Sequence, residues 1–289
     1  MNASSIHFSF ELFPPRTPVG WDKLPALASA LAAVQPAFFS VTYGAGGSDQ
    51  NGTYDTLIRV VEQTGIETAP HLTCIGSTRA KIGALLDRYK AAGVTRIVAL
   101  RGDLPATAVS SEAPGELRYA SELVAFIRQT HGDHFALEVA AYPEMHPQAA
   151  NPDADFDAFR RKVDAGASGA VTQYFYAAEA YFDFMERCAR AGITIPVVPG
   201  IMPITNHAQL MRFSAACGAD IPRWIRLRLE QYQDDKQALQ DFGLEVVTRL
   251  CRTLLDNGAP GLHFYTLNQA EPTLRLWRHL GLPMPIPGS

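Results

Sequence analysis

Short apolar segments alternate with segments of helical length along almost the whole chain, and this alternation constrains the fold more than any other feature. Eight segments rich in β-branched and aromatic residues are typical of buried strands: IHFSFEL, FFSVTY, ETAPHLTC, RIVALRG, ALEVAAY, AVTQYF, IPVVPGI and LHFYTL. Between them, helices are predicted at residues 21–34, 53–64, 78–92, 116–130, 155–165 and 178–191. Most successive strands end about 30 residues apart, which is the length of one βα unit.

Eight repeated βα units predict an α/β fold with a single (β/α)8 barrel of the TIM type, because eight tilted strands fill the interior with side chains. The last step is longer: residues 206–217, IPRWIRLRL and residues 235–256 predict an extra helical segment before the last strand. An open doubly wound sheet would need a glycine fingerprint in its first βα turn, and the sequence has none. We therefore expect one domain over residues 1–289, with about 283–289 as a flexible tail.

The composition excludes several classes of protein. The net charge of -4 and the pI of about 6.1 give no general attraction to nucleic acid or to an anionic membrane. Neither a run of about 18 apolar residues nor a signal peptide is present, so we expect a cytoplasmic protein. The four cysteines have no CxxC spacing, which predicts neither a zinc site nor a disulfide framework.

Polar residues are concentrated where the predicted strands end. In a barrel of this type the active site is assembled at these C-terminal ends, whereas a purely structural interior is mostly Val, Ile and Leu. The sequence therefore indicates an enzyme, with candidate residues Glu11, Thr42, Tyr43, His71, Arg101, Gly102, Asp103, Tyr142, Glu144, His146, Gln173, His263, Tyr265 and Asn268.

The first strand ends in a carboxylate with two possible roles. Glu11 follows Phe8 and Phe10, and an apolar surround would favour the protonated form that a general acid needs. A salt bridge to Arg16 is the alternative, because paired carboxylates also occur at barrel mouths. Position alone leaves both interpretations open.

Two charged segments and a set of histidines also allow alternatives. Arg101-Gly102-Asp103 is either a cradle for a polar ring or phosphate, or an ion pair at a tight turn. Arg160-Arg161-Lys162 either contacts a pyrophosphate or forms a solvated helix face. Three histidines at strand ends would suit a metal, but HxH and HExxH spacings are missing, so we predict no metal site.

Nine motifs in a fixed order carry a family resemblance that spans nearly the whole chain: FELFPPR, SVTYGA, APHLTC, IVALRGD, AAYPEMHP, RKVDAGA, TQYF, PGIMPI and HFYTLN. Together they resemble the methylenetetrahydrofolate reductase family, in its bacterial form with the catalytic domain only. The resemblance implies an FAD-binding barrel that reduces 5,10-methylenetetrahydrofolate to 5-methyltetrahydrofolate, with electrons from NAD(P)H, by ping-pong hydride transfer. It further implies a homo-oligomeric flavoprotein of one-carbon metabolism and methionine biosynthesis.

The resemblance also assigns roles to individual residues. Glu11 would be the acid that protonates the leaving nitrogen, and Asp103 would align the pterin and hold down the flavin potential. FAD would be held by Tyr43, Ala45, His71, Arg101, Gly102, Asp103, Tyr119, Ala120, Tyr142, His146, Asp155, Arg161 and Lys162. Substrate contacts would come from Thr42, Asp103, Gln173, Gln209, Phe213 and Gln269.

Two of these assignments have stated alternatives. Phe213 would stack on either ligand, but its helical spacing equally suits a core aromatic. After HFYTLN the family usually places an arginine that contacts the folate, and this chain has Gln269 instead. Either folate affinity is lower or another cation such as Arg275 substitutes.

Three other functions compete with the reductase. The first is another flavin-dependent barrel oxidoreductase acting on a different one-carbon or amine substrate. The second is a metal-dependent hydrolase or lyase, and the third is a non-catalytic flavin- or folate-binding protein. Against the third, a buried acid costs stability unless the chemistry uses it.

Overall fold

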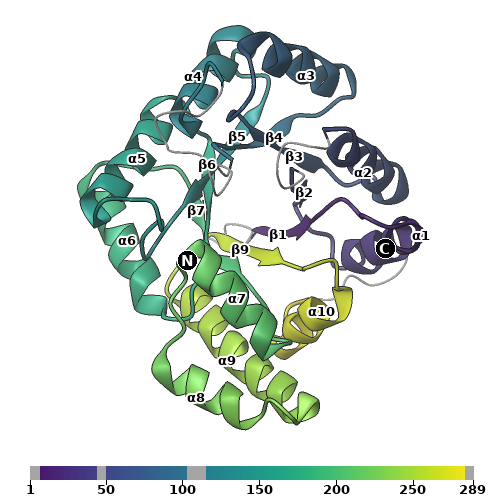
Figure 1. Ribbon diagram of the computed structural model, residues 1–289, viewed down its shortest axis with the longest axis vertical. Coiled ribbons are helices and arrows are strands. Elements are labelled where there is room, and N and C mark those ends of the chain that lie inside the picture. The colour runs from purple at the N-terminus through teal and green to yellow at the C-terminus, as the bar shows by residue number, and fades with distance from the viewer. Residues whose placement is uncertain (1–6, 44–49, 103–114, 284–289) are drawn as a thin grey trace.

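In the computed structural model, which describes residues 7–43, 50–102 and 115–283, helices surround a ring of parallel strands (Figure 1). The strands are β1 (His7–Leu12), β2 (Phe38–Val41), β3 (Thr68–Thr73), β4 (Arg96–Leu100), β5 (Ala136–Ala141), β6 (Gly169–Thr172), β7 (Val197–Val198), β8 (Gly200–Ile201) and β9 (Gly261–Tyr265). They pair in the order β7-β6-β5-β4-β3-β2-β1-β9-β8. Since β7 and β8 are consecutive in the chain, the sheet nearly closes on itself, which confirms the predicted α/β barrel.

Pro199 divides the seventh predicted strand into β7 and β8. Proline has no backbone N–H and cannot donate to a strand ladder. β7 pairs with β6 and β8 pairs with β9, while the Pro199 carbonyl accepts a hydrogen bond from the His263 N–H at 3.0 Å. Nine strands thus occupy the eight positions of the barrel, and the break lies where the ring closes.

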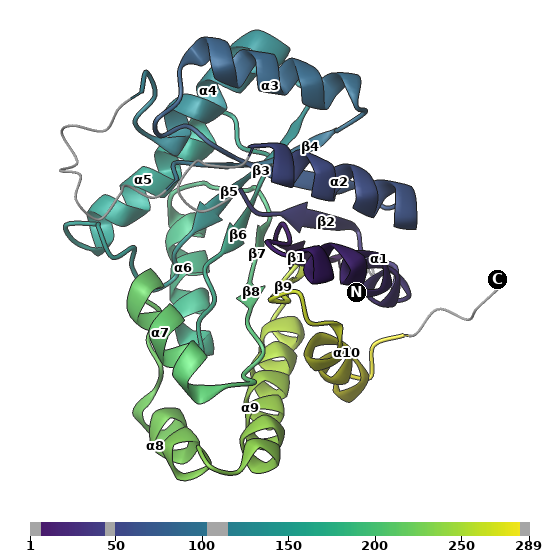
Figure 2. The same ribbon diagram turned by 45° about the vertical axis from the view of Figure 1, so that its right-hand side comes forward.

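The helices agree with the predicted ones to within a few residues. They are α1 (Pro18–Ala32), α2 (Gln50–Thr64), α3 (Arg79–Ala91), α4 (Ala120–His131), α5 (Pro152–Asp164), α6 (Ala178–Arg190), α7 (His207–Cys217), α8 (Arg223–Gln231), α9 (Lys236–Asp256) and α10 (Ala270–His279). α7, α8 and α9 form the predicted extra segment before the last strand, where they extend the molecule on one side (Figure 2). α10 was not among the predicted helices.

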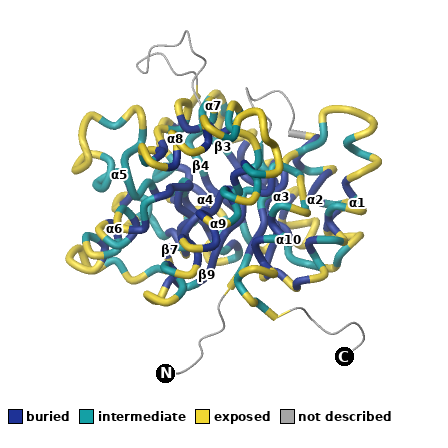
Figure 3. Tube along the Cα trace, turned by 90° about the horizontal axis from the view of Figure 1, so that it is seen from below, coloured by how far each residue is buried: buried dark blue, intermediate teal, exposed yellow. Residues whose placement is uncertain are grey.

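Side chains alternate between the two faces of β1. Phe8 and Phe10 point outward, and their rings lie 4.6 and 6.3 Å from that of Trp277 on α10. Ser9 and Glu11 point into the barrel. The period of two that defines a strand thus separates the apolar core from a polar interior. Buried residues gather at the centre of the molecule, and the exposed ones lie on its outside (Figure 3).

Paired charges fill the interior near the start of the strands. Arg96 donates to Glu138 Oε1 at 2.5 Å and to Glu67 Oε2 at 3.2 Å, and its guanidinium lies 4.7 Å from the ring centroid of Phe38. Burial raises the pKa of Glu138, and the Arg96 charge opposes that shift. We call Arg96, Glu138, Glu67 and Phe38 the barrel floor.

Within the described residues, none of the helices is both long and apolar enough to cross a membrane. All four cysteines are free thiols. The predicted tail lies almost entirely outside the described residues, and the assignment of the whole chain to one domain stays a prediction.

Gly200→Ala tests the close approach of β8 to β6. A methyl group on Gly200 would fall on the Thr172 carbonyl oxygen and against the Tyr265 ring, so we expect a loss of about 3 kcal/mol in the free energy of unfolding. Gly83→Ala on α3 is the control, because it has open space and should gain about 0.5–1 kcal/mol. Chemical denaturation measures both, and equal stability of the two variants would contradict the packing described.

Candidate active site

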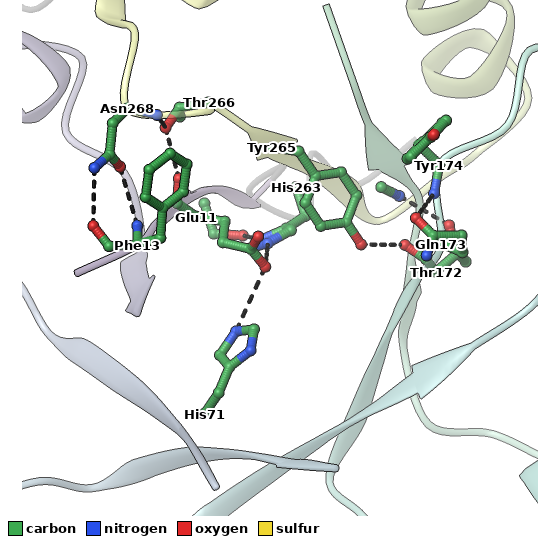
Figure 4. Close-up of polar contacts among 12 residues, drawn as sticks. Glu11, Phe13, His71, Thr172, Gln173, Tyr174, His263, Tyr265, Thr266 and Asn268 are labelled. Carbon is green, nitrogen blue, oxygen red and sulfur yellow. Dashed lines mark hydrogen bonds and ion pairs between the residues drawn. The ribbon is translucent and has the colours of Figure 1, made fainter. Parts of the chain in front are cut away.

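Three side chains from separate strands meet inside the barrel mouth (Figure 4). The Glu11 Oε2 atom lies 3.5 Å from His71 Nε2 and 3.9 Å from His263 Nε2. On the far side of its ring, His263 Nδ1 hydrogen-bonds the Ser9 hydroxyl at 2.7 Å. A chain of polar groups therefore runs from Ser9 through His263 to the Glu11 carboxylate, with His71 on the carboxylate's other side.

The groups in this series of polar contacts differ in how far they are buried. Ser9 and His263 are buried, whereas the Glu11 side chain keeps 18% of its surface exposed. Burial lowers the pKa of His71, while the nearby Glu11 carboxylate opposes this effect and His263 adds to it. The Glu11 carboxylate is thus the most exposed of these four groups, as a group that exchanges protons with a ligand requires.

The surroundings of Glu11 differ from those the sequence indicated. Phe8 and Phe10 lie on the opposite face of β1, so the predicted apolar surround was wrong because strand neighbours point to opposite sides. The alternative partner Arg16 does not hold the carboxylate either: among the described residues, the two histidines lie within ion-pair distance.

The turn after β9 holds the end of β1 in place. The Asn268 side chain accepts from the Phe13 N–H at 3.0 Å and donates to the Phe13 carbonyl at 2.8 Å, and the Thr266 hydroxyl donates to the Glu11 carbonyl at 2.6 Å. Leu267 and Asn268 have φ values of 50° and 54°, which non-glycine residues seldom adopt. Conformational strain here is offset by bonds that fix the backbone of Glu11.

A second group of predicted residues forms a hydrogen-bonded chain beside the mouth. Arg101, after β4, donates to Gln148 Oε1 at 2.5 Å; the Gln148 N–H donates to His146 Nδ1 at 3.0 Å; and the His146 N–H donates to Asp155 Oδ2 at 2.8 Å. The ring of Tyr142 packs edge-on against His146, with centroids 4.6 Å apart. The structure thus brings together residues from β4, the β5–α5 loop and α5.

Lys162 on α5 adds a cation to this group. Its amino group donates to the Ala140 carbonyl at 2.5 Å. Burial lowers its pKa to about 8, the Asp155 charge opposes that shift and Arg161 adds to it. Such an amine is readily stabilised in its charged form by an anion.

The other predicted cofactor contacts lie after β4, after β2, at the start of α4 and on α5. Gly102, with φ +90°, follows Arg101, and Tyr43 lies just beyond the end of β2. Tyr119 is 58% exposed at the N-cap of α4, followed by Ala120, and Arg161 is exposed on α5. Ala45 and Asp103 lie outside the described residues.

The predicted substrate contacts come from four segments. Thr42 is held by its backbone, which donates to the Leu12 carbonyl at 2.9 Å and accepts from the Thr53 hydroxyl at 3.0 Å. Gln173 follows β6, and its Oε1 accepts from the Tyr174 N–H at 3.0 Å. Gln209 and Phe213 are half-buried one turn apart on α7.

Gln269 lies apart from the Glu11 cluster. It is exposed at the N-cap of α10 and lines a pocket of about 220 Å³ between α9 and α10, together with Arg275. Arg275 donates to Asp241 Oδ1 at 2.8 Å, so this cation is already committed to an ion pair. If Arg275 substitutes for the family arginine, its guanidinium would serve the ligand beside, or in exchange for, this exposed partner.

Comparison with known proteins agrees with the nine motifs. The methylenetetrahydrofolate reductase family model matches residues 1–281. The chain belongs to this family. It is similar to the 5,10-methylenetetrahydrofolate reductases of Pectobacterium carotovorum (37% identical) and Escherichia coli (38%), covering 96% of this chain and 91% of each relative. A rice protein named probable methylenetetrahydrofolate reductase (NADH) is 38% identical over 95% of this chain, which corresponds to 48% of the rice protein.

A solved structure supports the fold of this reductase family member. A Clostridium thermocellum protein described as binding two copies of 5-methyl-5,6,7,8-tetrahydrofolic acid matches with a TM-score of 0.68 over 97% of this chain and 98% of that one. At 15% identity, the match concerns the fold alone.

Sequence analysis missed several residues around the reductase-family motifs. Ser9 lies two residues before Glu11, and strand alternation could have placed both on the inner face. Gln148 and Thr266 act through contacts that no spacing rule predicts. Among residues 7–43, 50–102 and 115–283, no three His, Cys, Asp or Glu side chains gather closely enough to hold a metal ion.

Asn268→Ala tests the turn that fixes Glu11. The variant loses two hydrogen bonds to Phe13 and places alanine at a positive φ, so we expect a loss of about 2–3 kcal/mol in stability. Asn257→Ala is the control, because its side chain makes one exposed bond to the Thr253 carbonyl and should cost less than about 1 kcal/mol. Similar losses in both variants, measured by denaturant unfolding, would refute the anchoring role.

Proposed function

We propose that the protein reduces 5,10-methylenetetrahydrofolate to 5-methyltetrahydrofolate, with electrons from NADH or NADPH passed through bound FAD in a ping-pong sequence. The observation that carries this proposal is the Glu11 carboxylate, partly exposed at the mouth of a barrel of this family and flanked by His71 and His263. Its bacterial and plant relatives are named as reductases of methylenetetrahydrofolate, which supports the reaction. The cytoplasmic location and homo-oligomeric state implied by the resemblance are part of the proposal.

The residues beside the mouth fit a flavin nucleotide. Lys162 and Arg101 provide positive charge for a diphosphate, and Tyr142 with His146 provides an aromatic and polar edge. The series of hydrogen bonds from Arg101 to Asp155 would hold these groups in place. When bound, FAD would supply a ring able to take a hydride from the nucleotide and give it to the folate.

Glu11 is assigned the proton transfer. Opening the five-membered ring of methylenetetrahydrofolate needs a proton on the leaving nitrogen, and Glu11 Oε2 would deliver it from the partly exposed end of the polar chain. His263, fixed by Ser9, and His71 would orient the carboxylate on either side. The resulting iminium carbon then receives the hydride and becomes a methyl group.

Gln173 and Phe213 are proposed to serve both ligands in turn. Gln173 would hydrogen-bond the pterin in one half-reaction and the nicotinamide in the other, and Phe213 would stack on whichever ring is present. Thr42, Gln209 and Gln269 are assigned further ligand contacts. Asp103 would align the pterin and lower the flavin potential by its negative charge.

An anaerobic absorbance experiment tests the function. The purified protein is reduced by NADH and, separately, by NADPH, and then mixed with methylenetetrahydrofolate. We expect a flavin band that bleaches with one or both nucleotides and returns with the folate. The rate with each nucleotide identifies the donor.

Two other outcomes would replace the proposal. Bleaching without return would keep the flavin but remove the folate, and it would favour another one-carbon or amine substrate. The absence of a flavin band even after FAD is added would contradict the flavin assignment.

Glu11→Gln separates the two half-reactions. We expect nucleotide oxidation at a near-normal rate and folate reduction slowed roughly a hundred-fold or more, because only the second half needs the proton. Stopped-flow absorbance measures each half. Glu245→Gln, which affects an exposed carboxylate paired with Arg249 on α9, is the control and should change neither. Equal slowing of both halves by Glu11→Gln would exclude the acid role.

The affinity for FAD should fall as the pH rises. Lys162 is charged below its pKa of about 8, and a neutral amine no longer attracts a diphosphate. The Kd for FAD, measured by fluorescence titration of the apoprotein, should therefore rise by up to roughly ten-fold per unit above pH 8. Lys162→Met should bind more weakly and lose this dependence, whereas Lys236→Met on exposed α9 should keep it. A wild-type Kd that is constant from pH 7 to 9 would contradict the contact.

A further inference from the structure

α7 carries two of the proposed ligand contacts but lies outside the strand ring. Gln209 and Phe213 are one turn apart on it, so both face the same direction. Asn206 caps the start of α7 by accepting from the Gln209 N–H at 2.8 Å, and Gly218 ends it with φ +77°. The position of this helix relative to the strands therefore sets where both side chains stand.

A buried hydrogen bond links α7 to the end of β6. The hydroxyls of Tyr174 and Ser214 are 3.0 Å apart, and both residues are at most 5% exposed. Tyr174 directly follows Gln173, and Ser214 directly follows Phe213. One bond thus joins the immediate neighbours of two proposed ligand contacts that are 40 residues apart in sequence.

The Tyr174 ring is held independently of its hydroxyl. It packs edge-on against Tyr176, with centroids 5.9 Å apart, and against Tyr265 at 6.2 Å. The Tyr265 hydroxyl donates to the Thr172 carbonyl at 2.7 Å, which fixes the same strand end (Figure 4). Removing the Tyr174 hydroxyl would therefore leave the ring in place and break only its link to α7.

The far end of α7 is attached to a different segment. The Asp220 N–H donates to Glu144 Oε2 at 2.9 Å, and a Cβ on Gly218 would lie 2.8 Å from the Pro147 side chain. These contacts tie the segment after α7 to the β5–α5 loop. The middle of α7, in contrast, is tied to the residue after Gln173 by the Tyr174–Ser214 bond.

We propose that Tyr174 is a positioning residue whose hydroxyl, through Ser214, holds α7 at the spacing from Gln173 that ligand binding requires. This inference rests on the proposed function for the identity of the ligands. A tyrosine is needed because phenylalanine would fill the same space without fixing the helix. Loss of the bond would let Phe213 and Gln209 shift relative to Gln173, which weakens the binding of both ligands but leaves the Glu11 cluster intact.

The test compares four variants with wild type: Tyr174→Phe, Ser214→Ala, the double variant and Tyr181→Phe. Tyr181 is the matched control, because it is a buried tyrosine whose hydroxyl donates to the Val197 carbonyl at 2.8 Å on the barrel wall. Hydrogen–deuterium exchange of peptides covering residues 207–217 reports on α7 without any assay of activity. We expect faster exchange in the first three variants and wild-type exchange in Tyr181→Phe.

Steady-state kinetics with the FAD-loaded protein provides the second readout. We expect KM for both nucleotide and folate to rise roughly five-fold in Tyr174→Phe, the size of one neutral hydrogen bond, with kcat close to wild type. In the double variant, KM should rise no further than in Tyr174→Phe alone, because that substitution already removes the bond to Ser214 together with the contact of the Tyr174 hydroxyl to Cys217. Tyr181→Phe should keep both KM values.

The outcomes separate this inference from the proposed function. Unchanged exchange of α7 in Tyr174→Phe would overturn the positioning role, and so would faster exchange with unchanged KM values. If the wild-type protein does not reduce methylenetetrahydrofolate, the proposed function fails, and the positioning role then stands or falls on the α7 exchange and on the KM for the nucleotide.

Discussion

The parallel register between β1 and β9 determines the chemistry of the barrel mouth. Ser9 stands opposite His263, and Glu11 stands opposite Tyr265. A slip of one residue would turn Ser9 and Glu11 to the outer face and bring Phe8 and Phe10 inside. The hydrogen bond between Ser9 and His263 and the Asn268 contacts to Phe13 both span this strand pair, so the same register that buries the core also positions the Glu11 carboxylate.

The strand ends could be predicted from the sequence because the barrel repeats one unit and because its active sites have a fixed end. Features that depend on contacts between distant parts of the chain could not be predicted in this way. The break at Pro199 depends on which neighbours each half pairs with, and spacing does not give pairing. The neighbours of Glu11 were misplaced because chain proximity was used where alternation applies, and the same alternation would have identified Ser9.

Contacts between helices were also beyond sequence patterns. The Arg275–Asp241 pair joins α10 to α9, and it changes how the missing family arginine is interpreted. The pair is exposed, so Asp241 would compete only weakly with an anionic ligand for the guanidinium. The Tyr174–Ser214 bond is similar: each residue alone looks like an ordinary core position, and only the fold shows that they meet.

The barrel floor limits how ligands can enter and leave the barrel. Arg96, with its two carboxylates and Phe38, fills the interior near the start of the strands, at the opposite end from Glu11. With side chains filling that end, a ligand can reach the Glu11 carboxylate only from the end where the strands finish. Under the proposed function, a product would leave by the same end through which the next ligand enters, so its release would limit the turnover as much as ligand entry does.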